Sequence, residues 1–248
     1  MPLAPFARKN TLNIEQAIRA GESYLSGFDL VYGHGTECPV DEAAWLILEA
    51  MQLSPLEEPD YSRVLDDEEK RVAMKFLRMR AEQRTPAAYI TGRTWFAGLE
   101  FFTDERALIP RSPLAEPIMQ GFSEFIDPSG ITRVLDMCTG GACIAVACAY
   151  AFADAQVDAV DISADALALA AKNIKFHQMQ DRVRIIQSDL FAELDPAHKY
   201  ELIISNPPYV DIGDMQALED EFKREPELGL AAGSDGGKQR RGPATGLS

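Results

Sequence analysis

A regular alternation of apolar strands and helices between residues 133 and 206 constrains the fold more than any other feature. The expected strands are RVLDMC, QVDAVDIS, RVRIIQSD and ELIISN, and the segments GACIAVACAYAF and DALALAAKNIKFHQ follow the first two as helices. Strands that alternate with helices of this length are typical of βαβ units in a parallel sheet with helices on both faces. The alternation therefore predicts an α/β fold whose ligands bind at the carboxyl ends of the strands.

The residues ahead of this region have a different periodicity. Apolar residues recur at three- and four-residue steps within residues 11–25, 40–53 and 65–83, which predicts helices without strands. In the next segment Gly92 and Gly98 flank aromatic and β-branched residues, a pattern typical of a hairpin. We therefore expect a small helical domain over residues 1–83, a β-hairpin linker over 84–112, an α/β domain over 113–237 and a disordered tail over 238–248.

The net charge limits the kind of partner. With a formal charge of −15 and a pI near 4.6, the chain has no basic stripe of the kind that attracts a phosphate backbone. This charge disfavours direct nucleic-acid binding and favours a basic protein or a small molecule. The sequence also has no apolar run long enough for a membrane span and no signal-peptide segment at its start, so we expect a soluble, cytoplasmic protein.

The cysteines invite a metal-binding interpretation because Cys138, Cys143 and Cys148 are spaced five residues apart. Two helical positions with this spacing lie about 140° apart around the axis, so Cys143 and Cys148 do not converge easily on one ion. The histidines are scattered and complete no ligand pair. We expect small, buried, reduced cysteines and no metal site.

Polar or glycine residues follow every expected strand. They are Asp136 with the loop CTGGA, then Asp161, then Ser188 with Asp189, and finally Asn206 with the sequence PPY. Because the carboxyl ends of parallel strands meet at one edge of a sheet, these residues are expected to surround one crevice.

The first two of these strand ends suggest the kind of ligand. Gly140 and Gly141 have no Cβ, so a ligand can approach their backbone, although the loop is not the GxGxxG of pyrophosphate sites. Asp161 ends the second strand, where an acidic residue can accept hydrogen bonds from both hydroxyls of a ribose. Each acid alone could be an ordinary strand-end turn residue. Together with the sequence SDLF they favour an adenosine ligand that lacks a diphosphate.

The stretch SNPPYVD, residues 205–211, ends the fourth strand with a rigid loop. Pro207 and Pro208 have no N–H to occupy nearby acceptors, and Asn206 is kept out of the helical region. The Asn206 side-chain oxygen and the Pro207 carbonyl are then two fixed acceptors that suit one planar NH₂ group. An amide nitrogen is a weak nucleophile that needs orientation and stabilisation of positive charge, to which the Tyr209 ring is suited. An ordinary Asn-Pro turn is the alternative.

With these motifs the sequence resembles the HemK-like protein-glutamine methyltransferases. The matching stretches are VLDMCTGGACIAVACA, DAVDIS, SDLF and ISNPPYV, and the resemblance extends from about residue 11 to residue 237. The segments VYGHGTECPVDEAAWLI and PRSPLAEPI resemble the branch of the family that modifies a ribosomal protein. The resemblance implies a Rossmann-like, class I S-adenosyl-L-methionine-dependent methyltransferase domain over residues 113–237, preceded by a helical substrate-recognition domain. It also implies transfer to the side-chain amide nitrogen of a glutamine in large-subunit ribosomal protein L-three, a basic substrate that suits an acidic enzyme.

The resemblance further implies a role for individual residues. The methionine part of the donor would be lined by Asp136, Thr139, Gly140 and Gly141. The ribose would be held by Asp161, and the adenine would be flanked by Asp189 and Leu190. The glutamine amide would be bound by Asn206, Pro207, Pro208 and Tyr209, with Asn206 also bordering the donor and with Asn206, Pro207 and Tyr209 as the catalytic residues.

Two departures from the family pattern leave alternatives open. Ala142 stands where the family usually has a third glycine, so a methyl group could crowd the donor or the next helix. After REPELGLAAGSDGG the family continues with a helix, a fifth strand and a closing β-hairpin, whereas this chain ends in KQRRGPATGLS. A C-terminally truncated chain is therefore expected, whose fourth strand has an open edge. The alternatives to an active protein methyltransferase are an impaired fragment and a methyltransferase for exocyclic amines of nucleic acids, which the acidity disfavours.

Overall fold

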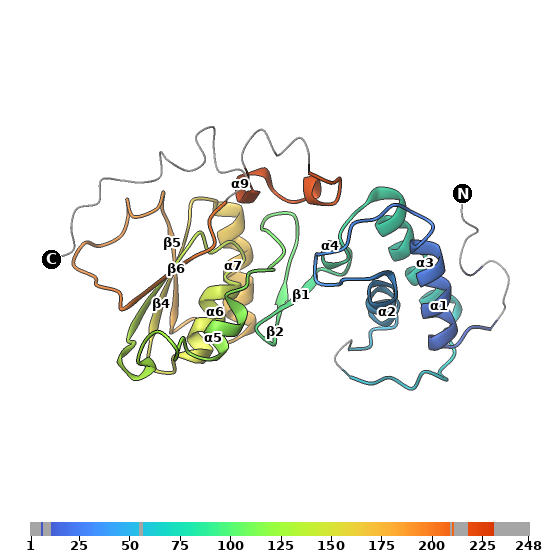
Figure 1. Cartoon of the computed structure of the whole chain (residues 1–248), viewed down its shortest axis with the longest axis horizontal. Coiled ribbons are helices and arrows are strands. Elements are labelled where there is room, and N and C mark those ends of the chain that lie inside the picture. Colours follow the sequence, from blue (N-terminus) through green and yellow to red (C-terminus); the bar gives the residue numbers. More distant parts are fainter. Residues whose placement is uncertain (1–5, 7–10, 55–56, 209, 211–217, 231–248) are drawn as a thin grey trace. The chain divides into compact units, whose positions relative to one another are not determined.

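The computed structural model describes residue 6 and residues 11–54, 57–208, 210 and 218–230, and the chain divides into two compact units, residues 1–93 and 94–248 (Figure 1). The expected tail over residues 238–248 lies outside the described residues. In the described part of the chain, no helix is both long enough and apolar enough to cross a membrane.

The first unit is helical, as the periodicity predicts. Its helices are α1 (Ile14–Leu25), α2 (Pro39–Ala50), α3 (Asp67–Gln83) and α4 (Ala87–Thr91). Capping boxes begin α1 at Asn13 and α3 at Asp66, where each side chain accepts a hydrogen bond from the backbone three residues on. Apolar faces of the helices meet in a core that includes Ile14, Ile47 and Leu77. The short helix α4 was not predicted. It follows Pro86, whose fixed φ suits the start of a helix.

A buried ion pair holds the first loop of this unit. Arg80 and Glu42 have side chains only 1% and 2% exposed, and the Arg80 Nε donates to Glu42 at 2.7 Å. The guanidinium also donates to the Val31 carbonyl at 2.7 Å and lies over the Tyr32 ring. Burial raises the pKa of Glu42, and the charge and hydrogen bond of Arg80 oppose that rise. The pair therefore fixes the chain around Val31 against α2 and α3.

The second unit begins with a β-hairpin of strands β1 (Arg93–Phe96) and β2 (Leu99–Phe102). Ala97 and Gly98 between the strands both have positive φ, as the tight turn of a two-residue hairpin requires. The helix expected from Leu114 is short, since α5 (Ala115–Met119) ends in a left-handed Gly121. The N–H groups of Gly121 and Phe122 then cap carbonyls of its last turn.

The core of the second unit is a parallel sheet of four strands in the order β5-β4-β3-β6. The strands are β3 (Arg133–Met137), β4 (Gln156–Asp161), β5 (Val183–Gln187) and β6 (Leu202–Ser205), close to the four predicted segments. The described residues also include the 3₁₀ turns η1 (Pro128–Gly130) and η2 (Phe222–Arg224) and the short helix α9 (Glu227–Leu230). In this part of the chain β6 stands at one end of the strand order, so its outer edge carries no described partner strand.

The expectation of helices on both faces is wrong for the described residues. Both α6 (Cys143–Ala151) and α7 (Ala164–Phe176) pack on the face that presents Val134, Val157 and Ala159 (Figure 1). The reason is topological: the steps from β3 to β4 and from β4 to β5 run in the same direction, and right-handed crossovers then put both helices on one face. The return from β5 to β6 contains turns in place of a helix.

On the opposite face, the sheet carries a buried charge. Asp158 of β4 accepts hydrogen bonds from Arg184, Arg133 and the Tyr200 hydroxyl. Burial alone would raise the pKa of Asp158, but these partners outweigh it and hold the pKa below its ordinary value. The three partners come from β5, β3 and the link to β6, so the charge network ties those segments to the central strand.

Candidate active site

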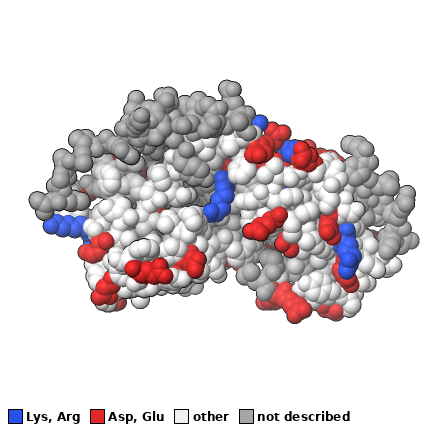
Figure 2. Space-filling model, viewed as in Figure 1, with Lys and Arg blue, Asp and Glu red and all other residues white. Residues whose placement is uncertain are grey.

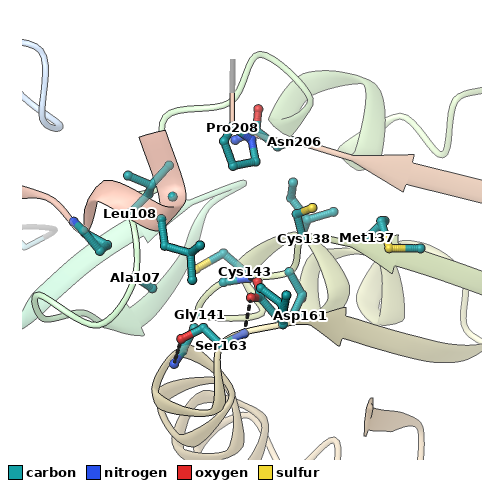
Figure 3. A pocket seen from close by; sticks show the side chains of 18 of the residues that line it. Ala107, Leu108, Met137, Cys138, Gly141, Cys143, Asp161, Ser163, Asn206 and Pro208 are labelled. Atoms are coloured by element: carbon teal, nitrogen blue, oxygen red, sulfur yellow. Dashed lines mark hydrogen bonds between the residues drawn. The ribbon is translucent and has the colours of Figure 1, made fainter. Parts of the chain in front are cut away.

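The carboxyl ends of the four parallel strands surround one cavity of about 140 Å³ (Figure 3). Eight of the predicted site residues line it: Thr139, Gly140, Gly141, Asp161, Asp189, Leu190, Asn206 and Pro208. The parallel register explains this convergence, since Met137 pairs with Val160 on one side and with Ser205 on the other, and the three strands therefore end together. The sequence expectation of one shared crevice is met by these eight residues.

Two residues of the prediction are placed differently, and a third is not described. Asp136 is completely buried beneath the loop and so does not reach the cavity surface. Pro207 is exposed, and the cavity lining includes its neighbours Asn206 and Pro208 but not Pro207 itself. Tyr209 lies outside the described residues.

The loop after β3 has an unusual backbone. Three of its residues have positive φ: Cys138 at 62°, Gly140 at 55° and Ala142 at 64°. Left-handed conformations cost a residue with a Cβ roughly 1 kcal/mol or more, so Cys138 and Ala142 are held there by their surroundings. Ala142 is fully buried in the core, and its methyl group therefore points away from the cavity. Ala142 is not among the residues that line the cavity, so its methyl group lies against the core and not against a ligand there.

Asp136 supports this loop from behind. Its Oδ2 accepts hydrogen bonds from the Thr139 hydroxyl at 2.5 Å and from the Ala145 N–H at 3.0 Å. Ala145 is the third residue of α6, and the N-cap Ala142 has no side chain to bond there, so Asp136 takes over the capping role. Burial raises the pKa of Asp136 to about 7, although the bonds from Thr139 and Ala145 oppose the rise. Asp136 therefore changes charge near neutral pH while holding both the loop and α6.

Asp161 lies at the end of β4 with both carboxylate oxygens engaged by the backbone. The Gly140 N–H donates to Oδ2 at 2.9 Å, and the Ser163 N–H donates to Oδ1 at 2.9 Å (Figure 3). A carboxylate has about four acceptor positions, so two remain for a ligand in the cavity. The bonds fix the carboxylate orientation and join the first and second strand ends.

The third strand end is held by Ser188. Its N–H donates to the Asp161 carbonyl at 3.0 Å and its hydroxyl donates to the Leu190 carbonyl at 2.8 Å. Leu190 has a φ of 52°, and this turn places both Asp189 and Leu190 on the cavity wall.

Two further walls of the cavity were not predicted as site residues. One is formed by residues 106–112, the loop after the hairpin, and the other by Pro226, Leu228 and Gly229 around α9. The stretch PRSP was noted in the sequence, but only as a mark of the family branch. No periodicity or spacing relates residues 106–112 to residues 226–229, which are more than a hundred positions apart, so the sequence offered no signal for this pairing.

A buried amide, also missed from sequence, anchors the glycine loop. The Asn173 Nδ2 donates to the carbonyls of Gly141 at 2.9 Å and Phe102 at 3.0 Å, and its Oδ1 accepts the Phe102 N–H at 2.8 Å. Asn173 is inaccessible to solvent and lies in the last turn of α7. One residue thus connects α7, β2 and the loop that borders the cavity.

Two of the four cysteines are buried as expected, whereas Cys38 and the cavity-lining Cys138 are only partly buried. Cys143 and Cys148 lie in α6, and burial raises the pKa of both thiols well above the ordinary value. Such thiols stay protonated and are poor metal ligands and nucleophiles. Within the described residues, no three His, Cys, Asp or Glu side chains gather where they could hold a metal ion.

Comparison with known proteins agrees with this architecture. Residues 122–227 match the family model of the methyltransferase small domain. The T. thermophilus 16S rRNA N2 G1207 methyltransferase, solved with AdoMet and guanosine, is 19% identical with a TM-score of 0.39 over 49% of this chain and 33% of its own. A likeness this low carries no weight for the ligand or substrate of this chain.

Relatives with a much higher identity are enzymes that act on a ribosomal protein. The ribosomal protein uL3 glutamine methyltransferase of Francisella tularensis is 46% identical over 92% of this chain and 73% of its own length. The protein of the same description from Bordetella pertussis is 42% identical over 92% of this chain and 77% of its own length. At this identity and coverage, the chain belongs to the family of the ribosomal protein uL3 glutamine methyltransferases.

Proposed function

We propose that the chain transfers a methyl group from S-adenosyl-L-methionine to the side-chain amide nitrogen of a glutamine in the large-subunit ribosomal protein uL3. The observation that carries this proposal is the shared cavity, which has the glycine loop and Asp161 at its base and Asn206 and Pro208 at its rim (Figure 3). In this proposal one side of the cavity would bind the donor and the other side would bind the acceptor. The description of its relatives supports the choice of substrate.

The donor side fits an adenosine ligand with a short polar tail. Asp161 would accept both ribose hydroxyls with its free acceptor positions, while Asp189 and Leu190 would flank the adenine. The loop of Thr139, Gly140 and Gly141 would take the methionine part, since no side chain of the two glycines blocks the backbone there. Asp136 would hold that loop from behind and would not touch the donor. When bound, the donor supplies an electrophilic methyl group on a positively charged sulfur.

The acceptor side would orient the glutamine amide. The Asn206 side-chain oxygen and the Pro207 carbonyl would accept the two N–H bonds of the amide and direct its nitrogen toward the methyl group. Tyr209 would pack on the flat amide and favour positive charge through its ring. As the new N–C bond forms, the S–C bond of the donor breaks and its electron pair remains on sulfur. The methylated nitrogen then loses its proton to water, so no general base is required.

The charge of the chain suits a basic protein substrate. The net charge is −15, and acidic side chains form several patches on the face shown in Figure 2, where basic ones are fewer. Ribosomal proteins are basic, and complementary charge speeds the encounter of two proteins. We further propose that residues 1–83 form the substrate-recognition domain and that residues 113–237 carry the catalysis, in a cytoplasmic enzyme.

Donor binding to the purified chain tests the first half of this proposal. Isothermal titration of S-adenosylmethionine should give saturable binding that Asp161→Ala weakens by about 100-fold, because two hydrogen bonds to a charged group are lost. Asp165→Ala is the matched control, since Asp165 is exposed in the first turn of α7 and does not line the cavity. Equal affinity of Asp161→Ala and the wild type would contradict the assignment of the ribose site.

A further inference from the structure

Two segments that the proposed reaction does not use form one side of the cavity. The first is the 106–112 wall, and the second is the 226–229 wall, formed by Pro226 together with Leu228 and Gly229 of α9. Figure 3 shows Ala107 and Leu108 of the first wall across the cavity from Cys138 of the glycine loop. The position of these walls therefore sets the width of the space opposite the donor loop.

Glu225 joins the two walls directly. Its Oε2 accepts the Ile109 N–H at 3.1 Å and the Arg111 Nη1 at 2.9 Å, and its Oε1 lies 2.7 Å from the same Nη1. The Glu225 side chain is 0% exposed, whereas that of Arg111 is 23% exposed. The Arg111 guanidinium also lies over the ring of Phe222 at 5.2 Å. One buried carboxylate thus holds both the backbone and a side chain of the 106–112 wall.

A second contact between the two walls places the side chain of Leu108 against the backbone of Gly229. A Cβ placed on Gly229 would lie 2.8 Å from the Leu108 Cγ, closer than real Cβ atoms come to other atoms. Gly229 has no positive φ that would demand glycine, and it lies in a helix, where glycine is unfavourable. The contact with Leu108 is the feature of this position that requires a residue without a side chain.

Because Glu225 is buried, its contact with the 106–112 wall is costly to break. A buried carboxylate is tolerated only where hydrogen bonds and an opposite charge replace water, and here the 106–112 wall supplies them. If that wall moved away, the carboxylate would lose these partners. The position of the two walls is therefore coupled to one ion pair.

We propose that Glu225 and Arg111 are positioning residues for the methyl donor, which act by fixing the 106–112 wall against the 226–229 wall. This inference rests on the proposed function. It predicts that a weaker contact between the two walls lowers the affinity for the donor, although no group that takes part in methyl transfer is removed. The KM for S-adenosylmethionine then rises, while kcat changes little once the donor is saturating.

The first test compares Glu225→Ala with Glu225→Gln in the full chain. By isothermal titration, Glu225→Ala should raise the Kd for S-adenosylmethionine at least about tenfold, because both bonds to the 106–112 wall are lost. The Kd of Glu225→Gln should lie between those of Glu225→Ala and the wild type, because the amide oxygen of the glutamine can still accept a hydrogen bond from the Ile109 N–H. Glu227→Gln, an exposed neighbour in α9 that does not line the cavity, is the matched control.

The second test leaves the ion pair intact. Gly229→Ala should raise the Kd at least about fivefold through its collision with Leu108, and Leu108→Ala in the same chain should restore most of the affinity. Relief of the collision would also reverse a general loss of folding, so recovery of affinity alone does not exclude that loss. Thermal unfolding of the donor-free variants measures that loss independently.

The outcomes separate the inference from the proposed function. The inference is supported if Glu225→Ala and Gly229→Ala bind the donor weakly and kcat is unchanged. The double variant must also recover the affinity that Gly229→Ala loses. Wild-type affinity in both variants overturns the inference and leaves the proposed function intact. A fall in kcat without a change in the Kd or KM also overturns it. A folded wild-type chain that binds no donor overturns the proposed function and the inference together.

Discussion

At the scale of the residue, the site depends on side chains that never touch a ligand. Asp136 caps α6 and binds Thr139, and Asn173 fixes the carbonyl of Gly141. Both are fully buried; Asp136 joins the loop to the helix that directly follows it, and Asn173 joins segments that lie far apart in the chain. The conformation of the loop that borders the cavity is therefore fixed by buried residues that do not line the cavity.

The charge state of Asp136 makes stability depend on pH. Its pKa is about 7 in the folded chain against 3.8 as the ordinary value, so the folded state binds more protons than the unfolded state between these limits. Stability from this group is therefore present at about pH 4 and is lost as the pH rises toward 7. In Asp136→Asn, the decrease in unfolding free energy over this interval should shrink by roughly 3 kcal/mol. Urea unfolding at several pH values measures it, and an unchanged pH profile would refute the raised pKa.

Ala142 offers a second prediction at this scale. Glycine would remove the cost of a positive φ, about 1 kcal/mol, but would also remove a buried methyl group worth a similar amount. We expect Ala142→Gly to change the unfolding free energy by less than about 1 kcal/mol. Ala142→Val should lose about 3 kcal/mol or more, because a β-branched side chain is both strained at this φ and too large for the core. Equal stability of the two variants in urea unfolding would contradict this account.

At the scale of the element, the sequence predicted what local patterns determine. The four sheet strands, α6, α7 and the three long helices of the first unit follow from the spacing of apolar residues, and the described bounds agree with the prediction closely. The same patterns located the ends of the strands, and eight residues predicted at these ends line the cavity. Asp136 was assigned to the cavity, although the alternation of side chains along β3 puts it on the same face as Val134, beneath α6.

The elements that were missed depend on tertiary contacts. The 106–112 and 226–229 walls meet through Glu225, and neither has a periodic pattern of its own. The absence of a helix on the second face of the sheet among the described residues follows from the direction of two crossovers, which the order of segments along the chain does not reveal. Local patterns do not reveal the order of the strands in the sheet, and this order determines on which face the helices pack.

The helical unit gives a prediction about its buried ion pair. Arg80→Met would leave the Glu42 carboxylate buried without its partner and should lower the unfolding free energy of the chain by about 3 to 5 kcal/mol. The double variant Glu42→Gln with Arg80→Met should recover part of this loss, because no charge is then left without a partner. Lys75→Met, exposed on the same helix, is the control. Denaturant unfolding followed by circular dichroism measures all three, and a loss as small as that of the control would contradict the account.

At the scale of the whole molecule, the negative charge should govern how fast the protein substrate arrives. Long-range attraction between an acidic enzyme and a basic protein is screened by salt, so the association rate with purified uL3 should fall at least about tenfold as ionic strength rises from ~0.02 M to ~0.2 M. Stopped-flow measurement of the association tests this. Donor affinity, which depends on contacts inside the cavity, should change much less over the same range. An association rate that does not respond to salt would contradict the role of the charge.

The central claim is that this cavity methylates a glutamine amide of uL3, and mass spectrometry of the product tests it most directly. The full chain is incubated with S-adenosylmethionine and unmodified uL3, and the peptides of uL3 are then fragmented to locate any added methyl group. The account predicts one methyl group on a glutamine side chain, lost with Asp161→Ala and with Asn206→Ala but retained with Asp165→Ala. A methyl group on another type of residue, or unmodified uL3 despite saturating donor binding, would contradict it.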